Sequence, residues 1–146
     1  MDVKTLVVHE IPVPKARPRA TMARGHAQIY TPKTTADYEK KISAAWKQEF
    51  GETPMDGPLC IRIHFGLPVP RSATKKDKAA MLNQEMKPTK KPDLDNLAKA
   101  VMDSLNGIAY RDDDQIVTLL VRKYYAEIPF VRIRIGPDGE KEGKAS

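Results

Sequence analysis

Residues 93–105 read DLDNLAKAVMDSL, and this stretch contains the clearest helix of the chain. Pro92 precedes it and Asn106–Gly107 follows it, so we expect a helix over 94–105 with Asp93 as its N-cap. Apolar residues recur at helical spacing and form one face that packs on a sheet: Leu94, Leu97, Ala98, Val101, Met102 and Leu105. The opposite face carries Asp95, Lys99 and Asp103 at intervals of four.

The segments on either side of this helix alternate apolar and polar residues, which is typical of half-buried strands. We expect strands over 4–9, 27–30, 59–65, 116–124 and 130–135. A long helix is expected from a cap at Thr34 or Thr35 to Phe50, and a short one around 76–84. This order predicts an α+β fold with a mixed or antiparallel sheet packed with two main helices. We expect one domain over 1–136 and a flexible tail over 137–146.

The composition is that of an ordinary globular protein with a basic charge balance. The 146 residues carry a net charge of +6, and the pI is about 9.4, which suggests a polyanionic partner. No apolar segment approaches the roughly 20 residues that span a bilayer, and the N-terminus lacks the regions of a signal peptide. The single cysteine, Cys60, has no intrachain partner. We therefore expect a reduced, cytoplasmic protein without a membrane partner.

Against this positive background, acidic residues gather at the start of the central helix and in the run 112–114. Carboxylate oxygens are the ligands that Mg²⁺ prefers. If Asp113 lies beside the helix N-terminus, it can join Asp93 and Asp95 in holding one or two Mg²⁺ ions. A bound metal neutralises phosphoryl oxygens and generates hydroxide near neutral pH, and Lys99 can donate to a phosphoryl oxygen or the leaving group. The pattern favours an enzyme that acts on nucleic-acid phosphates.

The same residues also have an ordinary structural explanation. Aspartate is common at helix N-termini because it caps the helix and complements its dipole. The ladder Asp95–Lys99–Asp103 adds at most about 1 kcal/mol as exposed ion pairs, and the run 112–114 fits a solvated turn. Both interpretations fit the spacing of these residues.

Basic residues cluster in the proline-rich loop near the N-terminus and in the segment 71–91. Isolated lysines are usually solvated, but clustering beside an acidic motif favours contact with backbone phosphates. The candidate DNA-binding residues are Lys15, Arg17, Arg19, Arg24, Arg71, Lys75, Lys76, Lys90 and Lys91.

These motifs together resemble the RusA family of Holliday junction resolvases. The family signature is an Asp-x-Asp-Asn-x-x-Lys helix start followed by an Asp-Asp-x-Gln-[Val/Ile] segment, and this chain has DLDNLAKA at 93–100 and DDDQIV at 112–117. The resemblance covers most of residues 10–125, and it extends to KKP at 90–92, DSLNG at 103–107, KARPR at 15–19, YTP at 30–32 and YE at 38–39.

The resemblance implies a RusA-like, homodimeric, Mg²⁺-dependent endonuclease that resolves four-way DNA junctions by paired nicks in recombination and repair, with Mn²⁺ as a substitute ion. Aligning on the glutamine after the acidic run selects the middle carboxylate of that run. The family's catalytic residues then fall on Asp93, Asp95, Asp113 and Lys99, with the three aspartates as metal ligands.

Two other function classes stay open. In a non-catalytic nucleic-acid-binding protein, the carboxylates would serve only as caps and surface pairs. A metal-dependent nucleotide phosphohydrolase would also use clustered carboxylates, but a small nucleotide needs no spread of basic residues. Cleavage of four-way junction and linear duplex, with Mg²⁺ or with EDTA, distinguishes the three classes.

Overall fold

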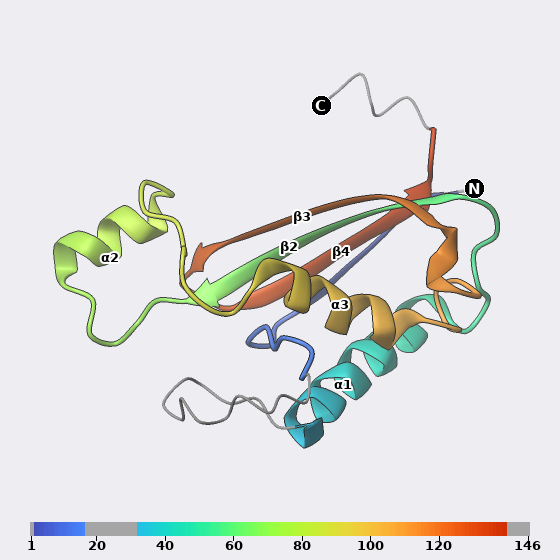
Figure 1. Ribbon diagram of the computed structural model, residues 1–146, viewed down its shortest axis with the longest axis horizontal. Helices are drawn as coiled ribbons and strands as arrows, with labels where there is room; N and C mark the ends of the chain where they lie inside the picture. The colour runs from blue at the N-terminus through green and yellow to red at the C-terminus, as the bar shows by residue number, and fades with distance from the viewer. Residues whose placement is uncertain (1, 17–31, 140–146) are drawn as a thin grey trace.

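The computed structural model describes residues 2–16 and 32–139, which form a sheet with two helices packed on one face and a third beyond its end (Figure 1). In chain order the elements are β1 (Lys4–Val8), α1 (Pro32–Phe50), β2 (Leu59–Pro68), α2 (Lys75–Leu82), α3 (Leu94–Leu105), the 3-10 turn η2 (Asp113–Gln115), β3 (Ile116–Ala126) and β4 (Phe130–Pro137).

The sheet has four strands in the order β1-β4-β2-β3. Strand β4 pairs antiparallel with both β1 and β2, whereas β2 and β3 run parallel. The parallel pair follows from the long connection through α2 and α3 that returns the chain to the starting edge. The expected α+β class with a mixed sheet is therefore confirmed.

The core lies between the sheet and the helices α1 and α3 (Figure 1). Alternate residues of β2 and β4 point into it and are fully buried, as the period of two in a strand requires. Helix α3 contributes the apolar face that its sequence predicts, and α1 contributes Tyr38, Ile42 and Trp46. The buried strand residues are Leu59, Ile61, Ile63, Phe65, Val131, Ile133 and Ile135.

The start of α1 differs from the sequence-based expectation. The helix begins at Pro32, so Thr34 and Thr35 lie in its first turn and neither is the N-cap. Proline fits the first helical position because that position needs no N–H donor. The Thr35 side chain is buried and donates to the Pro14 carbonyl oxygen at 3.1 Å, which ties the helix to the segment after β1. The end is as expected, since Gly51 follows Phe50 with a positive φ of 76°.

The last two strands are longer than their sequence pattern predicts. Strand β4 reaches Pro137, and the Asp138 N–H donates to the Pro58 carbonyl oxygen at 3.0 Å, so ordered structure continues beyond residue 136. The register between β2 and β3 shifts near Leu59, which leaves Val117 outside the pairing as a bulge close to η2. The expected strand 27–30 lies outside the described residues. Within the described part of the chain, no helix is long and apolar enough to cross a membrane.

Candidate functional site

The turn η2 carries the acidic run and is closed by its own side chains. The Asp112 carboxylate accepts a hydrogen bond from the Asp114 N–H at 2.9 Å. The Gln115 side-chain oxygen accepts from the backbone N–H groups of Arg111 and Asp112, at 2.8 and 3.2 Å. These reciprocal bonds form a capping box, which satisfies backbone donors that the short turn leaves unpaired.

Contacts from outside the turn fix its position in the fold. The Gln115 side-chain nitrogen donates to the carbonyl oxygens of Met55 and Gly57, both at 3.0 Å, just before β2. The Asn106 side-chain oxygen, at the end of α3, accepts from the Asp113 N–H at 2.8 Å. The acidic run is therefore anchored at both ends to the scaffold. The sequence pattern marks Asn106 as part of the helix stop and Gln115 as part of the acidic motif, but it does not reveal that their side chains hold the acidic turn in place.

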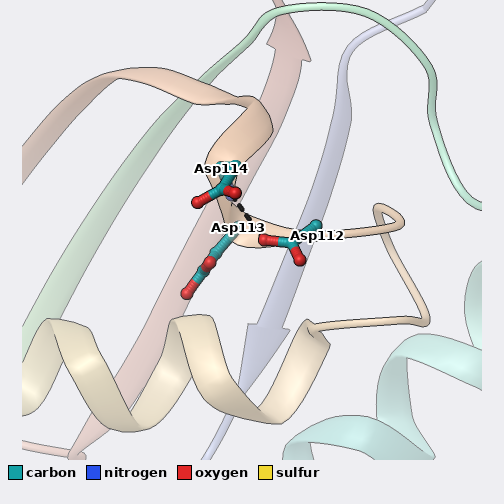
Figure 2. Close-up of side chains that lie close together, drawn as sticks. All are labelled: Asp112, Asp113 and Asp114. Carbon is teal, nitrogen blue, oxygen red and sulfur yellow. Dashed lines mark hydrogen bonds between the residues drawn. The ribbon is translucent and has the colours of Figure 1, made fainter.

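The three carboxylates of this turn offer oxygens that all lie within 4.8 Å of one another. Figure 2 shows Asp113 pointing toward α3, whereas Asp112 and Asp114 point elsewhere. Partial burial and the neighbouring carboxylates of Asp112 and Asp114 raise the pKa of Asp113, and Lys99 opposes that shift. Crowded oxygen donors of like charge are a chemical fit for a hard divalent cation, which would relieve their repulsion.

The other two predicted ligands lie at the start of α3. Asp93 occupies the expected N-cap position with an extended backbone, but its side chain makes no capping hydrogen bond. The Asp95 carboxylate accepts from the Asn96 N–H at 2.9 Å. Both side chains are exposed. Within the described residues, the Asn96 side-chain oxygen is buried and has no hydrogen-bond partner. At this end of the helix, the fold therefore leaves the Asp93 carboxylate without a capping bond and the Asn96 side-chain oxygen without a partner among the described residues.

The structure does not gather the full predicted ligand set into one cluster. In the described part of the chain, the group of three carboxylates within 4.8 Å of one another is Asp112–Asp114, without Asp93 or Asp95. The two acidic sites are linked through α3, because Lys99 lies one turn after Asp95 and acts electrostatically on Asp113. The assignment of Asp93, Asp95 and Asp113 to a shared metal stays a prediction.

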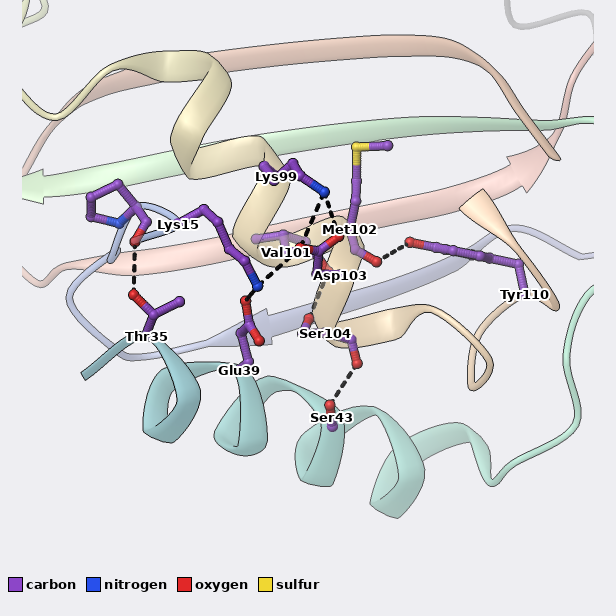
Figure 3. Close-up of polar contacts among 11 residues, drawn as sticks. Lys15, Thr35, Glu39, Ser43, Lys99, Val101, Met102, Asp103, Ser104 and Tyr110 are labelled. Atoms are coloured by element: carbon purple, nitrogen blue, oxygen red, sulfur yellow. Dashed lines mark hydrogen bonds and ion pairs between the residues drawn. The ribbon is translucent and has the colours of Figure 1, made fainter. Parts of the chain in front are cut away.

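Lys99 belongs to a network of two cations and two carboxylates (Figure 3). Its Nζ lies 3.0 Å from an Asp103 carboxylate oxygen, and Lys15 Nζ lies 3.0 Å from the other. Lys15 also contacts Glu39 of α1 at 2.9 Å. Burial alone would raise the pKa of Asp103, but the hydrogen bonds from Lys99 and Lys15 outweigh it and hold that pKa below its usual range. The network joins the loop after β1 to α1 and α3.

This network changes the interpretation of Lys15, which the sequence places among the DNA-binding residues. Its backbone N–H donates to the Asn96 carbonyl oxygen at 2.9 Å, and its side chain is engaged by two carboxylates. In the structure, Lys15 therefore positions the loop against the start of α3. Glu39 and Asp103 were not singled out as its partners, because residues distant in sequence form these contacts only in the folded chain.

Lys123 on β3 is a further residue with no sequence-based role. Its Nζ donates to the carbonyl oxygens of Lys90 and Pro92, both at 2.8 Å. Burial lowers the pKa of Lys123, and the nearby Asp93 carboxylate opposes the shift. The lysine therefore holds the turn that leads into Asp93 against the sheet.

The remaining predicted DNA-binding residues are spread over the surface. Arg71 is exposed after β2, the lysines at 75 and 76 are exposed in the first turn of α2, and those at 90 and 91 are exposed before α3. Arg17, Arg19 and Arg24 lie outside the described residues. Among the described residues, the side chains at 71, 75, 76, 90 and 91 form no ion pair with a carboxylate.

The structure therefore defines an α+β domain in which a mixed sheet and a lysine-bearing helix support an anchored acidic turn. Residues 11–136 match the family described as Endodeoxyribonuclease RusA, a span from the loop after β1 into β4. The chain belongs to the RusA endodeoxyribonuclease family. It is also 34% identical over 137 residues to the uncharacterized protein YqaN of Bacillus subtilis (strain 168), which covers 92% of this chain and 96% of that protein. The resemblance found in the sequence is confirmed.

Proposed function

We propose that the chain is a Mg²⁺-dependent endodeoxyribonuclease that resolves four-way DNA junctions by paired, symmetric nicks, as a homodimer acting in recombination and repair in the cytoplasm. The observation that carries the proposal is the acidic turn Asp112–Asp114, anchored over α3 and electrostatically coupled to Lys99, in a chain of this family. Mn²⁺ has the same preference for oxygen ligands and would replace Mg²⁺.

In this proposal Asp93, Asp95 and Asp113 hold the metal. When bound, Mg²⁺ supplies charge neutralisation at the phosphoryl oxygens and a hydroxide near neutral pH. Asp93 is suited to the role because its carboxylate is free of capping bonds. Asp113 is suited because its backbone N–H is bonded to Asn106, which holds the residue in place while its carboxylate stays available.

Lys99 is the proposed donor to a phosphoryl oxygen. Its side chain is 48% exposed and shares Asp103 with Lys15. When Lys99 turns toward DNA, Lys15 remains to compensate the Asp103 carboxylate. The network therefore lets Lys99 leave its resting partner without stranding a partly buried negative charge.

The proposed homodimer follows from the symmetry of the substrate. A junction is resolved by two equivalent nicks, and one acidic site serves one nick. A two-fold protein, the commonest oligomer symmetry, meets both strands at once.

The experiment is a nicking assay on a labelled four-way junction and a matched linear duplex, with Mg²⁺ or with EDTA. We expect Mg²⁺-dependent cleavage of the junction, and loss of cleavage with retained binding for Asp113→Asn and Asp95→Asn. Asp114→Asn is the matched control, because it removes the same charge from the same turn while Asp112 keeps the capping bond. Full activity of Asp95→Asn, or equal losses in the Asp113 and Asp114 variants, contradicts the assignment.

A further inference from the structure

The sheet face opposite the helices carries a group of arginines that the candidate site does not use. Arg62 on β2 lies opposite Arg134 on β4, and His64 lies opposite Arg132. On the other side of β2, His64 pairs with Arg122 of β3. Because side chains alternate along a strand and the intervening residues are buried against α1 and α3, all of these point away from the helices. We call Arg62, Arg122, Arg132 and Arg134 the arginine face.

Three of the four arginines of this face contribute positive charge that no carboxylate of the described residues balances. Within the described residues, Arg122, Arg132 and Arg134 make no ion pair with a carboxylate. The polar contact of Arg132 is with the Nδ1 atom of His64, at 3.3 Å. Burial lowers the pKa of His64, and the neighbouring arginines lower it further. The face therefore concentrates cations around a histidine that resists taking up a proton.

Such an arrangement is unfavourable for folding alone. Like charges that lie close together on one face of a sheet repel each other, and Arg122 and Arg132 flank His64 from the two strands next to β2. The long aliphatic stems shield the open face of the sheet, but glutamine or threonine would do so without repulsion. A partner that supplies negative charge explains the arrangement better than the fold does.

The shape of the face agrees with an extended, charged partner. A shallow recess lies between Arg62 and Arg134, over Cys60 and Gly136, with Val3 at its edge. The Val3 side chain packs closely over Gly136, where an added Cβ would lie 2.7 Å from it. Glycine at 136 therefore keeps the surface low between the two guanidinium groups, so that an extended partner can contact both.

We propose that the arginine face is a second DNA-contact surface, which binds backbone phosphates of a junction arm on the side of the sheet away from the acidic turn. The inference rests on the proposed function for the identity of the polyanion. A four-way junction has four duplex arms that leave in different directions, so one protein can contact DNA on more than one side. A second copy of the chain is a poor occupant, because it would bring an identical cluster of cations into contact.

The test compares the double variant Arg132→Gln/Arg134→Gln with the control Lys40→Gln/Lys47→Gln. The control removes the same charge from exposed positions on α1. Binding to a labelled four-way junction is measured in EDTA, where no cleavage occurs, between 50 and 200 mM salt. Each lost phosphate contact reduces the slope of log affinity against log salt by about 0.9. For the sheet variant we expect the slope to fall by about 1.8. Its loss of junction affinity relative to wild type is then about 12-fold smaller at 200 mM salt than at 50 mM.

Two further variants keep the test independent of folding. Arg132→Lys/Arg134→Lys preserves charge and is expected to retain most of the salt slope. Arg122→Gln removes one cation from the edge strand β3 and is expected to lower the slope by about 0.9. Melting temperatures of the glutamine variants should equal or exceed that of wild type, because cross-strand repulsion is relieved.

The outcomes separate this inference from the proposed function. Unchanged affinity and slope in the sheet variant, with wild-type junction cleavage in Mg²⁺, overturn the second surface and leave the nuclease standing. If the wild-type protein cuts no DNA but the slope of log affinity against log salt falls when the arginines are replaced, the second surface is supported and the nuclease is refuted. A changed sedimentation coefficient in the sheet variant, with unchanged DNA affinity, assigns the face to contact between copies and overturns the inference.

Discussion

Replacing Gln115 tests whether the anchoring of the acidic turn is what makes the site work. Its side chain makes four hydrogen bonds, two as acceptor within the turn and two as donor to the chain before β2. A net hydrogen bond contributes about 0.5–1.5 kcal/mol, and the exposed partners regain water. We therefore expect Gln115→Ala to destabilise the fold by about 2 kcal/mol, which lowers the melting temperature by about 4–8 °C in a chain of this size.

The functional effect should exceed what this destabilisation explains. Removing a residue that orients metal ligands lowers metal affinity or activity by about 10- to 100-fold. Gln115→Ala should therefore raise the Mg²⁺ concentration for half-maximal junction cleavage by about this factor, at a temperature where the variant is fully folded. A Mg²⁺ titration of single-turnover cleavage, with junction binding measured in EDTA, separates metal affinity from DNA affinity.

Two variants sharpen the result. Gln115→Glu keeps an acceptor for Arg111 and Asp112 but cannot donate to Met55 and Gly57, so it isolates the anchor from the capping box. Thr118→Val, on β3 just after the turn, removes the hydrogen bond that the Thr118 hydroxyl donates to the Asp138 carboxylate after β4, and it serves as a control for stability alone. A lower melting temperature with an unchanged Mg²⁺ requirement in both Gln115 variants would refute the argument that anchoring positions Asp113.

Three further outcomes are expected. Lys99→Ala should lower single-turnover cleavage by about 10²–10³-fold with a smaller loss of junction affinity, and Lys99→Arg should not restore it; equal losses in both quantities would make Lys99 an ordinary phosphate contact. Because folding lowers the pKa of Asp103, its stabilisation is present above the ordinary carboxyl pKa of about 3.9 and is lost as the pH falls through the lowered value. The melting-temperature gap between wild type and Asp103→Asn should therefore be constant near neutral pH and begin to narrow as the pH falls below about 4; a gap that does not narrow on acidification contradicts the pairing. Sedimentation at micromolar concentration should give a dimer, and a strict monomer that nicks both strands symmetrically contradicts the symmetry argument.

Local sequence signals predicted the elements whose formation is decided locally. Helix α3 has the expected bounds, because its apolar spacing, Pro92 and the Asn106–Gly107 stop all act within the same short segment. The expected start of α1 was wrong. Threonine is a good N-cap in general, but Pro32 suits the first helical position, so the helix begins before Thr34 and Thr35. The pattern of a half-buried strand was right for β2 but did not reveal its neighbours.

Strand order decided what the sequence pattern left open. Arg62 and His64 read as the polar side of one strand, and Arg132 and Arg134 as the polar side of another. Only the pairing of β2 with β4 places these residues opposite one another. The arginine face therefore depends on strand register, a non-local property, whereas each segment taken alone has the pattern of an ordinary solvated strand.

In the candidate site, too, some features follow from local sequence and others depend on contacts across the fold. The carboxylates at 93, 95 and 113 were recognisable because each sits at a marked point, a helix start or an acidic run. The side chains that hold them reach across the fold: Lys123 supports the turn before Asp93 from β3, and Asn106 holds Asp113 from the end of α3. Ligand identity thus follows from local chemistry, whereas ligand position is set by packing. The Gln115 variants change position and leave identity intact, so they probe the part of the site that the sequence motifs alone do not explain.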